Sequence, residues 1–229
     1  MNEGGIRKRV VLLNGSPKPG GGTSGVLGEY LLGKLRESGL ETEALSAARA
    51  IRSAGEMEKL LAALASSDLM VLVSPVYVDS LPYPVIKALE EIAEYLGGKA
   101  RRKKRGFAAI TNCGFPEALH NDTALEICRC FAGDAGFEWA GGLGLGGGQA
   151  LEGRPLEKSG FLVRHVRKAL DLAAEALAVG GVIPAEAGSL FSKRLMPVWV
   201  YLSVGEYGWK RQARKHGAEG KMRDRPYCS

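Results

Sequence analysis

A short apolar strand that runs into a glycine-rich loop and then a helix is the feature that most limits the fold of this chain. Residues 10–14 read Val-Val-Leu-Leu-Asn, and residues 15–24 read Gly-Ser-Pro-Lys-Pro-Gly-Gly-Gly-Thr-Ser. Such a loop turns backbone N–H groups, hydroxyls and the positive end of the following helix toward one point, which suits a phosphate. Two interpretations stay open: a phosphate-binding loop, or a flexible turn that only joins a strand to a helix.

The loop matches neither of two common nucleotide-binding motifs. It lacks the Gly-Lys-Ser/Thr ending of a Walker A sequence, and it lacks the Gly-x-Gly-x-x-Gly pattern with an acidic residue about 20 positions later. An ATPase and a dinucleotide-binding domain are therefore poor matches.

Predicted strands and helices alternate along most of the chain. The strands are expected at residues 10–14, 42–46, 68–75, 106–112 and 139–145, and the helices at residues 24–38, 56–66, 84–97, 116–132 and 161–179. This alternation implies right-handed crossovers and a parallel sheet. We predict an α/β, flavodoxin-like, doubly wound five-stranded sheet of order 2-1-3-4-5 with helices on both faces.

The alternation stops near residue 180. Residues 181–229 mix prolines, tryptophans and tyrosines with charged residues, without a clear rhythm of strands and helices. We expect a domain over residues 8–180 and a C-terminal extension over residues 181–229. The extension is predicted to pack across the domain or onto a second subunit.

The chain is basic, with a net charge of +6, and its basic residues gather at 99–105 and 210–225. Such clusters can bind nucleic acid or anionic lipid. No interleaved aromatic residues and no nucleic-acid-binding motif accompany them, so a solvated surface and no nucleic-acid partner are expected.

No apolar run approaches the roughly 20 residues that span a bilayer. The first nine residues also lack the apolar segment of a signal peptide. Four cysteines give no evenly spaced disulfide framework: Cys113, Cys128, Cys130 and Cys228. We therefore expect a cytoplasmic protein with no membrane partner.

Ligands of such sheets bind beyond the carboxyl ends of the strands. Residues 74–82, Ser-Pro-Val-Tyr-Val-Asp-Ser-Leu-Pro, follow the third strand and combine stiff prolines with apolar and aromatic surface. They suit a flat heteroaromatic ring, although Tyr77 could equally be a packing residue in a loop that covers the core. Residues 111–116 follow the fourth strand and add a hydroxyl, an amide, a glycine and an aromatic ring.

The two loops at residues 14–24 and 74–82, taken together, resemble the NADPH-dependent FMN reductase family of flavodoxin-like flavoproteins over about residues 8–180. The resemblance implies bound FMN, NADPH or NADH as co-substrate, and a homodimer or homotetramer. It implies no catalytic side chain, because the flavin carries the chemistry. The residues implied to bind FMN are Ser16, Lys18, Gly22, Thr23 and Ser24 at the phosphate, Pro75, Val76, Tyr77 and Val78 at the ring, and Asn112, Cys113 and Gly114 along its other side.

Three functions remain open at this stage. The first is an FMN-dependent NAD(P)H oxidoreductase whose acceptor is a small molecule such as a quinone, a free flavin, a nitro compound or a metal ion. The second is a non-catalytic FMN electron carrier, and the third is a binding protein that has lost productive flavin binding. The basic composition favours the enzyme, since NAD(P)H is an anion.

Other candidate residues carry less weight. His120 lies near the flavin-side loop and could touch substrate, whereas His165 is expected to be structural. Cys113 could be redox-active or a small packing residue. Cys128 and Cys130 lie about 200° apart around a predicted helix, so no iron–sulfur cluster and no metal site is expected.

Overall fold

The computed structural model describes residues 9–18, 20, 22–97, 104–151 and 154–224. Most of the first basic cluster, residues 99–103, and Cys228 lie outside the described residues. Of that cluster, Arg105 is buried and donates from Nη2 to the carbonyl of Ala65 at 2.9 Å. Lys104 pairs with Glu138 at 2.9 Å.

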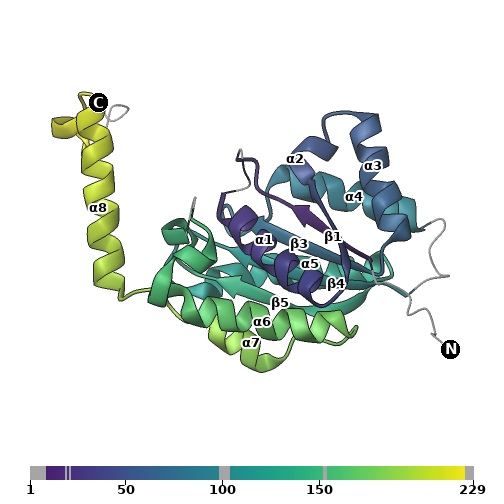
Figure 1. Cartoon of the computed structure of the whole chain (residues 1–229). Helices are drawn as coiled ribbons and strands as arrows, with labels where there is room; N and C mark the ends of the chain where they lie inside the picture. Colours follow the sequence, from purple (N-terminus) through teal and green to yellow (C-terminus); the bar gives the residue numbers. More distant parts are fainter. Residues whose placement is uncertain (1–8, 19, 21, 98–103, 152–153, 225–229) are drawn as a thin grey trace. The chain divides into compact units, whose positions relative to one another are not determined.

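A five-stranded parallel sheet forms the centre of the first part of the chain (Figure 1). Its order is β2-β1-β3-β4-β5, and all four neighbouring pairs are parallel. The strands are β1 (Arg9–Asn14), β2 (Glu41–Ser46), β3 (Leu69–Pro75), β4 (Gly106–Asn112) and β5 (Glu138–Leu145). The predicted flavodoxin-like fold and strand order are confirmed.

The burial of each strand follows its place in the sheet. The central strand β3 is buried at every position, because helices cover both of its faces. Neighbouring residues alternate between the two cores: Leu12 and Val71 face one, and Leu13 and Leu72 face the other. The edge strand β2 is only partly covered.

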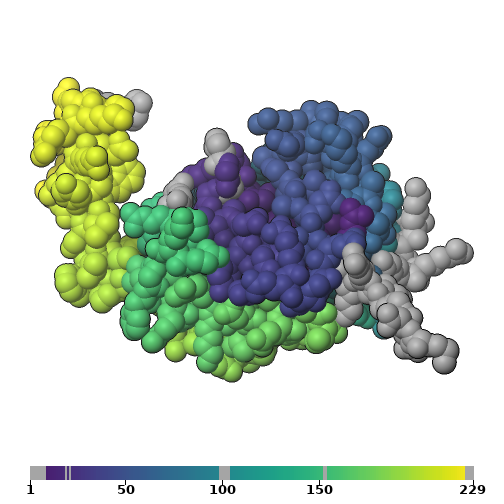
Figure 2. Space-filling view, viewed as in Figure 1, coloured from purple at the N-terminus to yellow at the C-terminus, as the bar shows by residue number. Residues whose placement is uncertain are grey.

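Helices cover both faces of the sheet. One face packs against α1 (Gly22–Glu37), α6 (Arg164–Ala178) and α7 (Ala185–Phe191). The space-filling view shows the side chains of α1 and α6 closing this face (Figure 2). The other face packs against α3 (Ala54–Ser66), α4 (Tyr83–Gly97) and α5 (Asp122–Asp134), with the short α2 (Ala47–Ala50) beside them.

Several helix boundaries differ from those expected. The link that follows β2 contains α2, whose N-cap Ser46 accepts a hydrogen bond from the N–H of Arg49 at 3.4 Å. The helices expected at 116–132 and 161–179 begin later, because 3₁₀ turns at Ala118–Asn121 and Gly160–Val163 come first. The α-helices themselves are α5 and α6.

Residues 181–229 contain helices that the sequence pattern did not reveal. Pro184 and Pro197 interrupt the apolar pattern, but each is the N-cap of a helix, α7 and α8 (Val198–Lys215) respectively. Contacts divide the chain into Met1–Leu195 and Met196–Ser229, so α7 belongs to the first unit and α8 to the second. The predicted division into a domain over residues 8–180 and an extension over residues 181–229 stays a prediction.

The segment before α7 is tied to a bulge in β5. Phe107 pairs with Trp139 and Ala108 with Gly141, so Ala140 is an extra residue in β5. The carbonyl of Ala140 accepts a hydrogen bond from the N–H of Ile183 at 2.8 Å. The bulge thereby anchors the chain that leads into α7.

His165 gives the domain a stability that depends on pH. Its Nε2 lies 3.2 Å from the carbonyl oxygen of Lys193. Burial lowers the pKa of His165 below its usual value of 6.5, and the hydrogen bond to Lys193 only partly offsets this. As the pH falls below about 6.5, the unfolded chain binds the proton first, so the folded state loses relative stability.

We expect the free energy of unfolding to fall as the pH is lowered from 7.5 to 5, as measured by urea denaturation with buffers of about 7.5, 6 and 5. The variant His165→Gln should lose part of this decrease, and the control His216→Gln should keep it. Equal pH dependence in both variants would contradict the assignment to His165.

Candidate functional site

One buried amide joins the carboxyl ends of β3 and β4 to the start of α1. Asn112, the last residue of β4, donates from Nδ2 to the hydroxyl of Ser24 at 2.9 Å and to the carbonyl of Ser74 at 3.2 Å. Its own carbonyl accepts from the N–H of Val76 at 2.8 Å. The predicted site residues Ser24, Val76 and Asn112 are therefore brought together.

The loop after β1 is shaped by two short side-chain turns. The N–H of Ser16 donates to Asn14 Oδ1 at 2.8 Å, and the N–H of Lys18 donates to Ser16 Oγ at 3.3 Å. The N–H of Gly15 donates to the carbonyl of Val73 at 2.8 Å, which holds the loop against β3. A Cβ on Gly15 would lie 2.6 Å from Ser74 Oγ, so only glycine fits this approach.

Helix α1 begins directly after the loop that follows β1, so its amino end lies at that loop. Gly22 begins the helix, and the first turn contains no acidic residue. The first N–H groups of an α-helix have no acceptor within the helix and carry partial positive charge. The Thr23 hydroxyl donates to the carbonyl of Gly148 at 2.7 Å, which ties α1 to the loop after β5. The backbone of this helix start, more than the Thr23 hydroxyl, is available to an anion.

A tight turn follows β3. Tyr77 and Ser80 exchange backbone hydrogen bonds of 2.9 and 3.2 Å, and the two residues between them, Val78 and Asp79, have φ values of 51° and 57°. Positive φ at both central positions is the pattern of a type I′ turn, which favours asparagine and glycine. Val78 is 98% exposed, so its side chain gains no packing from this conformation. The turn is strained at a β-branched residue.

We expect Val78→Asn to raise the free energy of unfolding by about 1 kcal/mol, because asparagine tolerates the left-handed conformation that valine resists. Val78→Ala is the matched control and should change stability less, since alanine keeps a Cβ without the polar side chain. Urea denaturation of the three proteins measures the differences. A loss of stability in Val78→Asn would show that the valine side chain makes a stabilising contact.

Pro75, Val76 and Tyr77 differ in what they offer a ligand. Pro75 ends β3, and the side chain of Val76 lies in the core with an exposed fraction of 8%. Tyr77 is 46% exposed. The N–H groups of Val78 and Asp79 have no hydrogen-bond acceptor among the described residues.

The loop after β4 holds a buried thiol. Cys113 Sγ lies 3.5 Å from the carbonyls of Phe115 and Glu117, and it accepts from Asn121 Nδ2 at 3.4 Å. Burial raises the pKa of the Cys113 thiol, so the thiol is protonated at neutral pH. Next to it, a Cβ on Gly114 would meet only Gln149 Nε2, at 3.7 Å, which leaves the space above Gly114 open to a ligand.

The structure adds a cluster that connects the loops after β3 and β4. The ring of His120 packs on Phe115 with centroids 4.4 Å apart, and its Nδ1 lies 3.8 Å from Asp79 Oδ1. The sequence places His120 near this loop, but no sequence signal pairs it with Asp79. Gly148 was also missed, although the glycine run at 146–148 marked its loop.

These residues fit FMN. The start of α1 offers amide groups without a carboxylate in the first turn, which suits a phosphate. The loop after β3 combines the exposed ring of Tyr77 with two amides that have no acceptor among the described residues, and the loop after β4 adds the ring of Phe115, which is 59% exposed. A flat ring needs this combination of apolar surface and hydrogen-bond donors.

Comparisons of structure agree with the fold. With a TM-score of 0.52 in each case, the chain is similar to three solved proteins. An FMN-dependent NADH-azoreductase from Bacillus anthracis in complex with FMN is 14% identical over 75% of this chain and 100% of that chain. An oxidoreductase from Corynebacterium diphtheriae is 12% identical over 81% and 97%. Rubredoxin oxygen:oxidoreductase from Desulfovibrio gigas is 11% identical over 79% and 37%. At these identities the likeness shows the fold alone.

Comparisons of sequence define the family. A search of curated proteins found no match. Residues 8–121 match the model of a family described as NADPH-dependent FMN reductase. This match contains the loops after β1 and β3, on which the resemblance was based, and the start of the loop after β4. Over residues 8–121 the chain therefore belongs to the NADPH-dependent FMN reductase family.

Proposed function

We propose that this chain is an FMN-dependent NAD(P)H oxidoreductase that delivers electrons to a small-molecule acceptor, such as a quinone, a free flavin, a nitro compound or an azo compound. The observation that carries the proposal is the amide-rich start of α1, free of carboxylates in its first turn and joined by hydrogen bonds to the ends of β3, β4 and β5. The family match and the FMN-bound azoreductase of the same fold support it.

The loop after β1 and the start of α1 would hold the phosphate of FMN. Ser16, Lys18, Gly22, Thr23 and Ser24 all belong to this segment. A helix start and a lysine offset the phosphate charge without leaving it buried and unpaired. Because Thr23 and Ser24 already bond to Gly148 and Asn112, their main contribution is to hold the helix start in position.

The loops after β3 and β4 would hold the ring. Tyr77 offers an exposed aromatic face, and Val78 and Asp79 offer backbone N–H groups. Asn112, Cys113 and Gly114 would line the other side. When bound, FMN supplies the redox chemistry by accepting hydride from NAD(P)H and passing two electrons on. The chain itself binds and orients the two ring systems.

No described residue needs to act as a strong acid or base in this proposal. The Cys113 thiol is buried and protonated, so we assign it a packing role rather than a redox role.

No helix among the described residues has both the length and the apolar composition to span a bilayer.

The test is an absorbance spectrum of the purified protein, before and after added FMN, followed by anaerobic titration with NADPH and with NADH. We expect bound flavin whose visible absorbance bleaches within the time of mixing with one of the two nucleotides. Recovery of the absorbance on adding quinone, nitro or azo compounds then ranks the acceptors.

Two outcomes would contradict the proposal. Bound FMN that either nucleotide reduces only over many minutes would favour a non-catalytic electron carrier. A colourless protein that does not bind added FMN would favour a binding protein that has kept the fold without the cofactor.

A further inference from the structure

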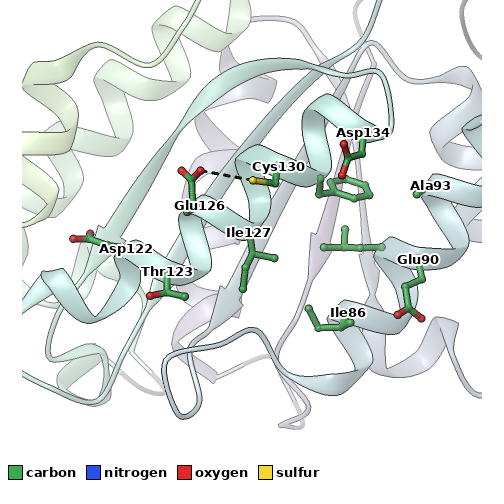
Figure 3. Close-up of a pocket in the computed structure, with 11 residues that line it drawn as sticks. Ile86, Glu90, Ala93, Asp122, Thr123, Glu126, Ile127, Cys130 and Asp134 are labelled. Atoms are coloured by element: carbon green, nitrogen blue, oxygen red, sulfur yellow. Dashed lines mark hydrogen bonds between the residues drawn. The ribbon is translucent and has the colours of Figure 1, made fainter.

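A groove of about 800 Å³ lies between α4 and α5, on the face of the sheet that α1 and α6 do not cover. Figure 3 shows the carboxylates that line it: Glu90 on α4, and Asp122, Glu126 and Asp134 on α5. This negative charge would repel the phosphates of NAD(P)H, so the groove does not suit the nucleotide donor of the proposed function. Positive charge gathers instead at the start of α6.

The start of α6 carries cations that no carboxylate balances. Arg164 and Arg167 lie in its first turn, which contains no acidic residue. Lys193 lies close to them, because its carbonyl oxygen is 3.2 Å from Nε2 of His165. Burial lowers the pKa of His165 most, and the charges of Lys193 and Arg164 lower it further. Among the described residues, neither Arg164 nor Lys193 forms an ion pair, so both charges are available to an anion.

An exposed aromatic ring lies beside these cations. Phe161 is 76% exposed, and the guanidinium of Arg164 lies 4.3 Å from the centre of its ring. Arg167 Nη2 donates to the carbonyl of Gly160 at 3.3 Å, which holds the segment that carries Phe161. A cation–π contact keeps the ring and the guanidinium together, and a heteroaromatic base can stack on either of them. The pair therefore suits the adenine of a nucleotide.

The cluster adjoins the loop after β4. Arg194, the neighbour of Lys193, places Nη2 3.2 Å from Glu117 Oε1, and the carbonyl oxygen of Glu117 lies 3.5 Å from Cys113 Sγ. Cys113 belongs to the loop that we propose to line the flavin ring. NAD(P)H carries its adenine and its nicotinamide at opposite ends, so an adenine site is expected beside the ring site. One ring with two cations matches a single nucleotide better than a nucleic-acid strand, which needs an extended basic groove.

We propose that Phe161, Arg164 and Lys193 bind the adenosine end of the co-substrate, with the adenine on Phe161 and the 2′-phosphate between Arg164 and Lys193. This site, which rests on the proposed function of the chain, makes NADPH the preferred donor. NADH differs from NADPH only in lacking the 2′-phosphate, so it loses the contacts to both cations. Arginine suits a phosphate because its planar guanidinium can donate two parallel hydrogen bonds.

Isothermal titration calorimetry with adenosine 2′,5′-bisphosphate and with adenosine 5′-monophosphate isolates the 2′-phosphate. We expect the full-length chain to bind the bisphosphate at least about tenfold more tightly, the effect of one or two hydrogen bonds between charged groups. Arg164→Gln with Lys193→Gln should lose this preference, because neutral amides do not attract the phosphate charge. Lys59→Gln with Arg129→Gln is the control and should keep the preference, since it removes the same charge from exposed positions on α3 and α5.

The aromatic ring and the cations should give different results. Phe161→Ala is expected to weaken both ligands at least about fivefold and to leave the preference unchanged, because both carry the same adenine. In the enzyme assay, the double variant should lower kcat/KM for NADPH at least about tenfold and change kcat/KM for NADH less than about threefold. Unchanged affinities in Phe161→Ala would overturn the stacking contact.

Three results would overturn the phosphate contact: equal affinities of the two ligands for the wild-type chain, a preference that survives in the double variant, or an equal loss for both ligands in that variant. These titrations need neither bound flavin nor turnover. A flavin that NADPH reduces in a chain without the preference would therefore refute this site alone. A preference that depends on Arg164 and Lys193, in a chain whose flavin neither nucleotide reduces, would refute the proposed function alone.

Discussion

Ser16→Asp is expected to lower the affinity for FMN at least about 100-fold, whereas Ser16→Asn should change it less than about threefold. The two side chains have the same shape, and both can accept the N–H of Lys18 as Ser16 Oγ does at 3.3 Å. They differ only in charge. A carboxylate about 4 Å from a phosphate charge costs on the order of 4 kcal/mol at an effective dielectric constant near 20, more than the roughly 2.7 kcal/mol of a 100-fold change.

Fluorescence titration of the flavin-free proteins with FMN measures this difference. Repeating the titration at high salt should narrow the gap between the two variants, because salt screens the repulsion. Equal affinities in the two variants would show that the phosphate does not bind near Ser16. A loss in both variants would show instead that the loop cannot accept a longer side chain.

Gly146→Ala is expected to lower the free energy of unfolding by about 2–3 kcal/mol. An added Cβ would lie 2.4 Å from the carbonyl oxygen of Pro116 and 2.8 Å from the carbonyl carbon of Glu117. Both obstacles are backbone atoms, which cannot turn aside as a flexible side chain can. The adjacent residue is also fixed, since the N–H of Gly147 donates to the carbonyl of Phe115 at 2.6 Å.

Gly33→Ala provides the matched control for the same change. Gly33 lies inside α1, and a Cβ there would meet nothing within 4 Å. Alanine should therefore stabilise this helix by about 0.5–1 kcal/mol. Urea denaturation of both variants measures the opposite signs. If Gly146→Ala were as stable as the wild type, the loops after β4 and β5 would have to be able to move apart.

The sheet and its order could be predicted because they depend on local patterns. The apolar runs of β1 and β3 and the helical spacing of α1 and α4 are contained in short stretches of sequence. Their alternation indicates a parallel sheet, and five such strands match the flavodoxin-like order. Helix α2 could not be predicted in this way, because four residues are too few for a periodic pattern. The starts of α7 and α8 were hidden by prolines that interrupt the apolar pattern.

The candidate site could be predicted as a set of loops but not as a network. The glycine-rich loop and the Ser-Pro-Val-Tyr segment have sequence signals of their own. The bond from Asn112 to Ser24 joins residues 88 positions apart, and no local pattern indicates it. The turn at Val78 and Asp79 was hidden for the opposite reason: its sequence lacks the asparagine or glycine that such a turn favours.

The bond between Thr23 and Gly148 has a consequence for the order of events during synthesis. Its two partners are 125 residues apart in the chain, so the first loop leaves the ribosome long before its acceptor is made. Domains fold as units during translation, and β5 is the last strand to emerge. A nascent chain that ends before residue 148 therefore cannot make the hydrogen bond that fastens the amino end of α1, and the candidate site lacks this support until nearly two-thirds of the polypeptide exists.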